Sequence, residues 1–217
     1  QKIQVQSNGG LIVAIISNGT TIADAGAFSA NLGSMTHIKT LTASSSGTLS
    51  FVDGASSVVL DDTYPIYQFE IFNIHPANNS IEFRFNGSAD TGSNYNVVKT
   101  STFFEAANYE NDSLTNFRYR TDLDLAQSAA FQCLASDVGN LADECTSGTL
   151  TIFNPSSTVF VKHYISSFNC YVANNQSQQS FIGGYLNTTS AVDAIRFQMS
   201  SGNMDSGKIK LYGIKDS

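Results

Sequence analysis

The pattern of hydrophobic and polar positions near the end of the chain predicts two β-strands. Apolar and polar side chains alternate over Ile195–Met199, and they alternate again over Lys208–Leu211 after a turn-forming run at 200–207. Alternation on both sides of a loop rich in Gly, Ser, Asn and Asp is typical of an antiparallel hairpin with one solvent-exposed face. We expect this hairpin to close the sheet, with five apolar side chains turned to the core: Ile195, Phe197, Met199, Ile209 and Leu211.

Alternation also predicts strands from His37 onward. The strongest is Tyr64–His75, where Pro65 lies at the start and Pro76 just beyond the end, positions at which proline does not interrupt a ladder. Strict alternation in this strand places four side chains on one face: Tyr67, Phe69, Ile71 and Asn73. The other predicted strands span residues 37–43, 48–52, 81–86, 95–104, 148–153, 159–172 and 179–186.

The stretch Thr121–Glu144 breaks this rhythm. Apolar residues recur in it at helical spacing: Leu123, Ala126, Ala130, Leu134, Val138 and Leu141. This spacing predicts a short helix or a compact loop. The acidic residues Asp122 and Asp124 near its start suit the N-terminus of a helix.

Residues 1 to about 35 differ in texture from the rest. The apolar run Leu11–Ile16 lies between polar, glycine-containing turns, and small residues follow as far as Gly33. Such a segment fits an extended arm that pairs with a sheet edge on a neighbouring molecule. A first strand of the same domain fits equally well. We divide the chain into an N-terminal arm or anchor, residues 1–35, and a β-sandwich domain, residues 36–217.

These patterns together predict an all-β fold. Nothing in the chain alternates strands with long helices, which argues against a doubly wound parallel sheet. About nine or ten strands with loop signals between them favour an antiparallel β-sandwich of jelly-roll type. We expect it to carry an extended N-terminal arm and one short helix or long loop.

Charge and composition exclude several functional classes. The formal charge is −7, and the eleven Lys and Arg residues are dispersed, so the basic footprint of a nucleic-acid binder is missing. The longest apolar run, Leu11–Ile16, is far shorter than the roughly twenty residues that span a bilayer, so we expect no membrane insertion. It also lacks the features of a signal peptide, and because the chain begins with Gln1 we expect a trimmed start.

The three cysteines, Cys133, Cys145 and Cys170, form no CxxC or Cys/His pattern. An odd number without such spacing argues against a disulfide framework or a zinc site. Free thiols that behave as small apolar residues are the favoured interpretation, and a single Cys133–Cys145 bridge is the alternative.

Candidate chemistry is sparse. Asp61–Asp62 and Asp122–Asp124 resemble fragments of a calcium site, but they lack EF-hand spacing and suit solvated loops. A glycosidase needs two carboxylates in one groove, and Trp, a common sugar platform, is absent. The glutamates available for such a pair are Glu70, Glu82, Glu105 and Glu110.

The histidines show no metal-binding pattern such as HxxxH: His37, His75 and His163. No nucleophile elbow or nucleotide-binding glycine motif occurs either. We therefore expect no enzyme activity, no cofactor, no metal, and no catalytic or cofactor-binding residue.

A binding role has one source of support in the residues alone. Four tyrosines lie in predicted strands or loops, where their rings would stack on sugars: Tyr109, Tyr119, Tyr171 and Tyr185. Core packing explains most of these positions as well.

A family resemblance covers most of residues 36–217. It rests on LDDTYPIYQFEIFNIHP at 60–76, DLAQSAAFQCLASDVGN at 124–140, TSGTLTIFNPSSTVFVKHY at 146–164 and GGYLNTTSAVDAIRFQMSSGNMDSGKIKLYGIK at 183–215. In these stretches the chain resembles virion structural proteins of tailed bacteriophages, especially those of marine hosts such as cyanobacteria. The group includes capsid decoration proteins and tail-associated proteins.

The resemblance implies a non-enzymatic β-sandwich module that assembles in several copies, as a homotrimer. We expect a capsid decoration or knob protein that docks on the major capsid protein or another virion protein through residues 1–35. Its place would be the virion, assembled in the host cytoplasm. The alternative is a tail-fibre or receptor-binding module that recognises host-surface carbohydrate through loops at 87–94 and 200–207. An acidic secreted lectin or hydrolase carries the least support.

Overall fold

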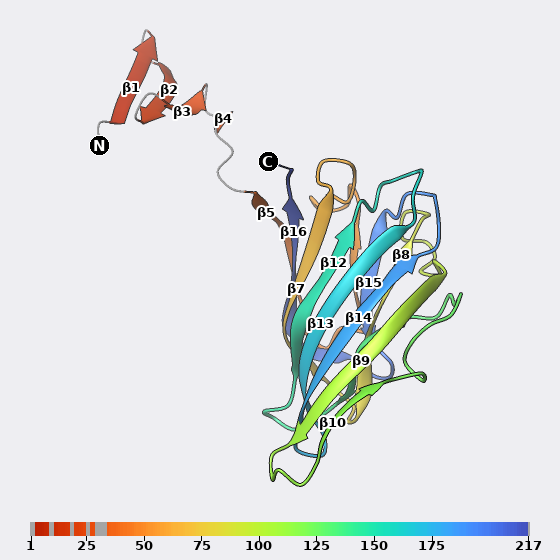
Figure 1. The fold of residues 1–217 in the computed structure, drawn as a ribbon. Coiled ribbons are helices and arrows are strands. Elements are labelled where there is room, and N and C mark those ends of the chain that lie inside the picture. Colours follow the sequence, from red (N-terminus) through yellow and green to blue (C-terminus); the bar gives the residue numbers. More distant parts are fainter. Residues whose placement is uncertain (1–2, 9–10, 18–19, 25–26, 29–33, 217) are drawn as a thin grey trace. The chain divides into compact units, whose positions relative to one another are not determined.

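The computed structural model describes residues 3–8, 11–17, 20–24, 27–28 and 34–216, and every regular element in them is a β-strand. The chain divides into two compact units, residues 1–34 and residues 35–216, each of which is described by itself. Figure 1 shows both as ribbons. The described residues form no helix able to cross a membrane. The fold is all-β, which confirms the fold class predicted from the sequence.

The N-terminal unit is a small antiparallel meander. Each of its strands pairs with the next along the chain: β1 (Ile3–Asn8), β2 (Leu11–Ser17), β3 (Thr20–Asp24) and β4 (Ala27–Phe28). The run Leu11–Ile16 therefore finds its partners in β1 and β3, within its own segment, and is not an extended arm. Short connections favour this pairing because closing a short loop costs little chain entropy. The small residues expected at 25–26 and 29–33 lie outside the described residues.

The second unit contains twelve antiparallel strands. They are β5 (Met35–Thr42), β6 (Thr48–Val52), β7 (Ile66–Pro76), β8 (Ile81–Ser88), β9 (Lys99–Tyr109), β10 (Thr115–Tyr119), β11 (Gln132–Val138), β12 (Thr146–Phe153), β13 (Lys162–Val172), β14 (Gln176–Leu186), β15 (Ala194–Met199) and β16 (Met204–Ile214).

These strands form two runs that meet at one point. The longer run has the order β5-β16-β7-β12-β13-β14-β9-β10, and the shorter has the order β11-β8-β15-β6. A single residue pair, Val138 with Val172, joins β11 to β13, so the twelve strands make a nearly closed sheet. Figure 1 shows β12, β13, β14 and β9 side by side across the front.

One aromatic cluster joins the two runs. Phe197 of β15 stacks on Phe83 of β8, with ring centroids 5.7 Å apart and planes 9° from parallel. It also meets Phe69 of β7 at 5.2 Å and Phe51 of β6 at 6.3 Å, both edge to face. All four side chains are fully buried. Because Phe69 belongs to the longer run and the other three to the shorter, this cluster holds the runs together.

The last two strands are correctly located by the sequence but incorrectly paired. All five apolar side chains expected in the core are buried there. However, β15 pairs with β6 and β8, whereas β16 pairs with β5 and β7, so they do not form a hairpin. The loop between them carries the chain from one run to the other. Alternation reports which face of a strand is buried, and it does not report the strand's partner.

Strand β7 departs from strict alternation at Asn73. Tyr67, Phe69 and Ile71 are buried as predicted, but Asn73 is exposed and Ile74 is buried instead. Asn73 has a positive φ of 48°, and the pairing of β7 with β12 shifts its register at this place. A bulge therefore shifts the alternation of buried and exposed positions by one residue at the end of the strand. Ile74, an apolar residue, lies in the core as a result.

The predicted helix between Thr121 and Glu144 is wrong. Residues 120–131 form an irregular loop, consistent with the loop alternative, and Gln132–Val138 form β11. This strand is buried on both faces, and its edges pair with β8 and, at a single residue pair, with β13. Five consecutive buried residues leave no alternation to detect, and the helical spacing arose by coincidence. Strand β10 was missed as well.

Candidate functional site

Strands β14, β9 and β10 are neighbours that carry aromatic side chains outward, while their inner face holds polar side chains together with Phe103, Ile182 and Leu186. On β14, Ser180 is fully buried, whereas Phe181 is 45% exposed. On β9, Glu105 is fully buried and Phe104 is 38% exposed, while Phe117 on β10 is 70% exposed. A sheet with one solvated face normally shows the opposite arrangement. An exposed apolar surface of this kind marks a place of interaction, and it is the candidate site.

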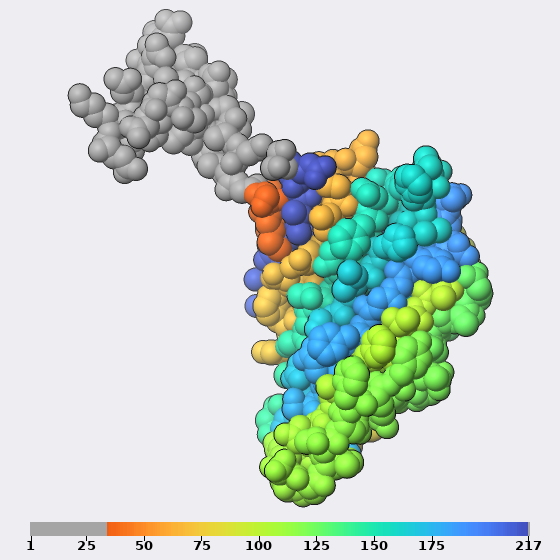
Figure 2. All heavy atoms as spheres, viewed as in Figure 1, coloured from red at the N-terminus to blue at the C-terminus, as the bar shows by residue number. Residues whose placement is uncertain are grey.

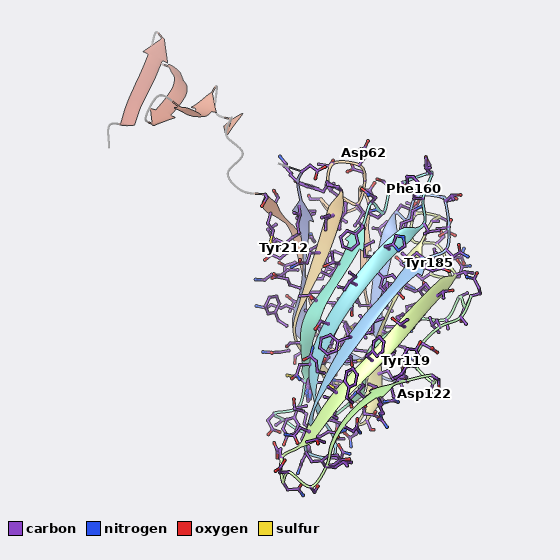
Figure 3. The ribbon with its side chains drawn as sticks, viewed as in Figure 1. Asp62, Tyr119, Asp122, Phe160, Tyr185 and Tyr212 are labelled. Carbon is purple, nitrogen blue, oxygen red and sulfur yellow. The ribbon has the colours of Figure 1, made fainter. Side chains whose placement is uncertain are left out.

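Five outward-facing rings make up this surface, which we call the aromatic face: Phe104, Phe117, Tyr119, Phe181 and Tyr185. Strand register brings them together, because Phe104 lies directly opposite Phe181 on one side and Tyr119 on the other. The Phe104 ring is parallel to that of Phe117, with centroids 6.2 Å apart, and edge-on to that of Tyr119 at 5.2 Å. Figure 3 labels Tyr119 and Tyr185 on the front strands.

Gly183 leaves a gap in the side-chain layer between Phe181 and Tyr185. All three residues point to the same side of β14 because they are two positions apart. A Cβ atom built on Gly183 would have a single atom within 4 Å, the Thr102 Oγ1 at 3.8 Å. The main chain of β14 is therefore bare at this point, with room above it for another group.

Neutral hydrogen-bonding side chains surround the rings. Gln179 Nε2 donates a hydrogen bond to Ser167 Oγ at 2.7 Å, and Thr102 Oγ1 donates one to the Gly183 carbonyl at 3.3 Å. The outward-facing positions of β13, β14, β9 and β10, all of which the structure describes, hold no Lys, Arg, Asp or Glu. In Figure 2, the strands that carry this surface lie where the blue and green bands adjoin.

A buried ion-pair network fixes β10 to β9. Glu105 Oε1 accepts a hydrogen bond from Arg118 Nη2 at 2.7 Å, and Glu105 Oε2 accepts one from Arg120 Nη1 at 2.5 Å. Arg120 also donates to both carboxylate oxygens of Asp122, at 2.9 and 2.8 Å. This contact lowers the pKa of Asp122 to about 2. The network holds the backbone that presents Phe117 and Tyr119.

Lys99 lies at the other end of β9 and is fully buried. Its Nζ donates to Asn86 Oδ1 at 2.6 Å and to the Val97 carbonyl at 2.7 Å. No carboxylate among the described residues forms an ion pair with it. Burial without a counter-charge penalises the ammonium form, which lowers the pKa of Lys99 to about 7.

The interior behind the aromatic face is polar. Gln132 Oε1 accepts hydrogen bonds from Ser101 Oγ at 2.6 Å and from Tyr164 OH at 3.2 Å. Gln178 Nε2 donates to Ser136 Oγ at 2.6 Å. Burial raises the pKa of Tyr164 above its ordinary value. Polar groups and the apolar side chains of Phe103 and Ile182 therefore share the inner side of these strands.

The four tyrosines singled out in the sequence separate into two groups. Tyr119 and Tyr185 belong to the aromatic face. Tyr109 and Tyr171 instead line an open cleft of about 420 Å³ near the ends of β9 and β13, together with Glu110. A hydrogen bond with Glu110 raises the pKa of Tyr171. The sequence therefore identified two members of the aromatic face but did not bring them together.

The acidic pairs do not converge on a metal. Asp61 Oδ1 accepts the Thr63 amide at 2.8 Å, and the pKa of Asp61 is lowered by its hydrogen bonds to Thr63. Asp122 is held by Arg120, and Asp124 Oδ2 accepts the Tyr119 hydroxyl at 2.6 Å. Within the described ranges, no three His, Cys, Asp or Glu side chains are grouped to hold a metal ion.

The glutamates and histidines occupy separate surroundings. Glu82 pairs with Arg84 on β8 at 2.7 Å, Glu105 is enclosed by arginines, Glu70 lies on β7, and Glu110 lines the cleft. The histidines contact different neighbours: His37 with Thr40, His75 with the Glu144 carbonyl, and His163 edge-on to Tyr185.

The two loops considered for carbohydrate contact are occupied by their own hydrogen bonds. Asp90 accepts hydrogen bonds from Ser88 Oγ at 2.6 Å and from the Asn94 amide at 2.8 Å, and these bonds lower the pKa of Asp90 to about 2. In the second loop, Ser201 Oγ accepts a hydrogen bond from Asn78 Nδ2 at 3.0 Å. Side chains that are engaged in this way are poorly placed to receive a ligand.

All three cysteines lie in the described part of the chain and are free thiols, so the Cys133–Cys145 bridge does not form. Cys133 and Cys170 are buried and Cys145 is half-buried. Burial raises the pKa of Cys133 well above its usual range and that of Cys170 to about 12.

Sequence reasoning missed Phe104, Phe117, Phe181 and Gly183. The available signal was the recurrence of Phe181 and Tyr185 on one face of β14, but Ile182 and Leu186 place apolar residues on the other face as well. From sequence alone, aromatic residues that alternate along a strand are candidates for the core face. Only the structure shows that it is the opposite face that is enclosed. Comparison with protein-family models, curated proteins and solved structures found no match.

Proposed function

We propose that this protein is a non-enzymatic structural component of a bacteriophage virion, a capsid decoration protein that docks on the major capsid protein. The division of the chain carries the proposal: residues 35–216 enclose a continuous core, and residues 1–34 form a separate unit. Such a division suits a protein held on a particle by one unit while it displays the other. The resemblance of residues 36–217 to virion proteins of tailed phages adds to this support.

The proposal includes a jelly-roll sandwich for the second unit. Its support is a nested pairing, in which the first strand pairs with the last and each following pair lies inside: β5 with β16, β6 with β15, β7 with β12, and β8 with β11. This nesting results when one long eight-stranded hairpin folds over on itself. The segments β9–β10 and β13–β14 are then insertions that widen one layer.

The oligomer and the location are part of the same proposal. The protein acts as a homotrimer on the virion, after assembly in the host cytoplasm. The strands at two sheet edges, β6 and β10, are five residues long each. Short edges of this kind are easily covered within an oligomer. On a symmetric shell, several modest contacts then act together to give stable attachment.

Deletion of residues 1–34 tests the docking role. The truncated protein should keep the cooperative unfolding transition of residues 35–216 and fail to co-purify with particles. Full-length protein with the exposed loop substitution Phe160→Ala is the control, and it should still decorate particles. Incorporation of the truncated protein at the normal level would show that the N-terminal unit is not the anchor.

The alternative is a tail-fibre or receptor-binding module that recognises host-surface glycan. One observation favours it, the exposed aromatic face of β14, β9 and β10. Labelling the protein with an antibody on intact particles separates the two roles, because the label would lie on the capsid for a decoration protein and at the tail for a receptor-binding module.

A further inference from the structure

We propose that the aromatic face is a binding site for a neutral carbohydrate chain, which lies across β14, β9 and β10 above Gly183. This assignment names a site and a ligand class, and it does not depend on the virion role or on the position of the protein on a particle. The loops at 87–94 and 200–207 take no part in it.

The first step is the exposure of several aromatic rings on these strands. Folding alone favours burial of Phe117 and Phe181 by about 2 kcal/mol each, yet they are 70% and 45% exposed. The inner face of β9 and β14 is already filled by other residues, including the buried Phe103 and Ile182. A group of exposed rings on one sheet surface marks a place of interaction.

The second step is the geometry of the rings. The Phe104 ring contacts the rings of Phe117 and Tyr119, and the Tyr119 hydroxyl donates a hydrogen bond to Asp124 at 2.6 Å. Strand backbone and a fixed hydroxyl hold these rings in place before binding, which lowers the entropy lost on association. The ring of a sugar presents C–H groups on one face, and these pack on the electron-rich face of an aromatic ring.

The third step is the absence of charge together with the presence of hydrogen-bonding groups. Gln179, Ser167 and Thr102 border the rings and can exchange hydrogen bonds with hydroxyl groups. The outward-facing positions of the described strands β13, β14, β9 and β10 bear no Lys, Arg, Asp or Glu, and their one imidazole is that of His163. A single-stranded nucleic acid also stacks on aromatic rings, but it needs a positively charged groove, and the formal charge of this chain is −7.

The fourth step is the size of the surface. Its exposed aromatic side chains present on the order of 400 Å² of apolar area. This area suits a few sugar units of a chain, and the test below includes the other occupant of such an area, a second copy of the protein. Gly183 keeps the centre of the surface low enough for the chain to pass.

Affinity gel electrophoresis of the full-length protein tests the proposal. The probes are dextran, laminarin and hydroxyethyl cellulose as neutral chains, with alginate as an anionic chain. Two kinds of variant are compared: Phe117→Ala and Phe104→Ala remove a ring, whereas Gly183→Thr fills the gap. The matched control is Phe160→Ala, which removes a phenylalanine of similar exposure, 72%, from a loop outside the site. Thermal melting confirms that each variant is folded.

We expect at least one neutral chain to retard the protein, with dissociation constants raised about tenfold or more in the three site variants and unchanged in the control. Retardation that is equal in all variants would place binding elsewhere and overturn the proposal. The absence of retardation by every neutral chain would overturn it too. Self-association that Phe117→Ala abolishes, measured by sedimentation, would assign the face to a second copy instead.

Discussion

Glu105 on β9 is fully buried, and its Oε2 accepts a hydrogen bond from Arg120 Nη1 at 2.5 Å. The other oxygen of the same carboxylate accepts a hydrogen bond from Arg118, so the buried negative charge of Glu105 forms ion pairs with two arginines. Arg118 lies on β10, and Arg120 follows directly after this strand. The contact therefore links the last strand of the longer run to its neighbour and supports the aromatic face from behind.

Replacing Glu105 by Gln should destabilise the protein by about 2 kcal/mol, because it weakens the charge-assisted hydrogen bonds that the buried carboxylate accepts from Arg118 and Arg120. Urea unfolding measures the change. The control is Asp112→Asn, an exposed position with a positive φ that asparagine tolerates. Hydrogen exchange should also show faster opening of β10. Equal stability of the two variants would mean that the network does not hold this strand.

Lys99 should make stability depend on pH between 7 and about 10. Its pKa is about 7 in the folded protein, below the ordinary value of 10.5. Between these values the unfolded chain keeps a proton that the folded chain has released, so stability rises with pH, by at most about 1.4 kcal/mol per pH unit. Below pH 7 both states hold the proton and the dependence ends.

Urea unfolding at several pH values, with the variant Lys99→Met, tests this. The variant should lose the part of the rise that Lys99 causes and keep the part caused by Lys162, whose pKa burial also lowers. It retains one partner of Asn86 Oδ1, the Gly87 amide at 2.8 Å. Lys208→Met, at an exposed position, should behave as the unmodified protein does. A rise of the same slope in Lys99→Met would refute the assignment to Lys99.

Replacement by alanine should change the stability of the protein very differently at the adjacent glycines Gly183 and Gly184. A Cβ on Gly184 would lie 2.6 Å from the Thr100 carbonyl oxygen and 2.7 Å from the Tyr164 hydroxyl, so Gly184→Ala should cost about 1–3 kcal/mol. A Cβ on Gly183 meets only Thr102 Oγ1 at 3.8 Å, so Gly183→Ala should be neutral or slightly stabilising. Thermal melting of both variants checks the difference, and equal losses would contradict it.

Phe197→Ala should destabilise the protein by about 3–5 kcal/mol, since it removes the ring that contacts Phe51, Phe69 and Phe83. Phe160→Ala, at a position 72% exposed, should change stability by no more than about 0.5 kcal/mol. Chemical denaturation of both proteins gives the comparison. A loss below 1 kcal/mol for Phe197→Ala would show that the two runs are held by other contacts.

Cysteine accessibility gives a further test. Only the thiolate reacts with a disulfide reagent such as DTNB, and burial both shields Cys133 and Cys170 and raises their pKa. In native protein at pH 8 we expect slow reaction of Cys145 alone, and reaction of all three thiols after unfolding. Cys145→Ser should abolish the native reaction. Fewer than three reactive thiols in unfolded, unreduced protein would indicate a disulfide.

The sequence determined the fold class and the position of most strands. Alternation identified β7, β12, β15 and β16, and it identified the core residues of the last two, because a strand with one enclosed face repeats every two residues. It failed for β11, which is enclosed on both faces. It also failed for the partner of β15, since pairing depends on residues far away in the chain.

Only the tertiary structure decided which surface is the candidate site. Strand β14 has apolar residues on both faces, Phe181 and Tyr185 on one and Ile182 and Leu186 on the other, so hydrophobicity alone does not assign its core face. The structure turns Ile182 and Leu186 inward together with Gln178, which donates a hydrogen bond to Ser136, far away in sequence. Period-two patterning is a local property of the chain. Which face of a strand meets water depends on the polar groups that the rest of the fold places against it.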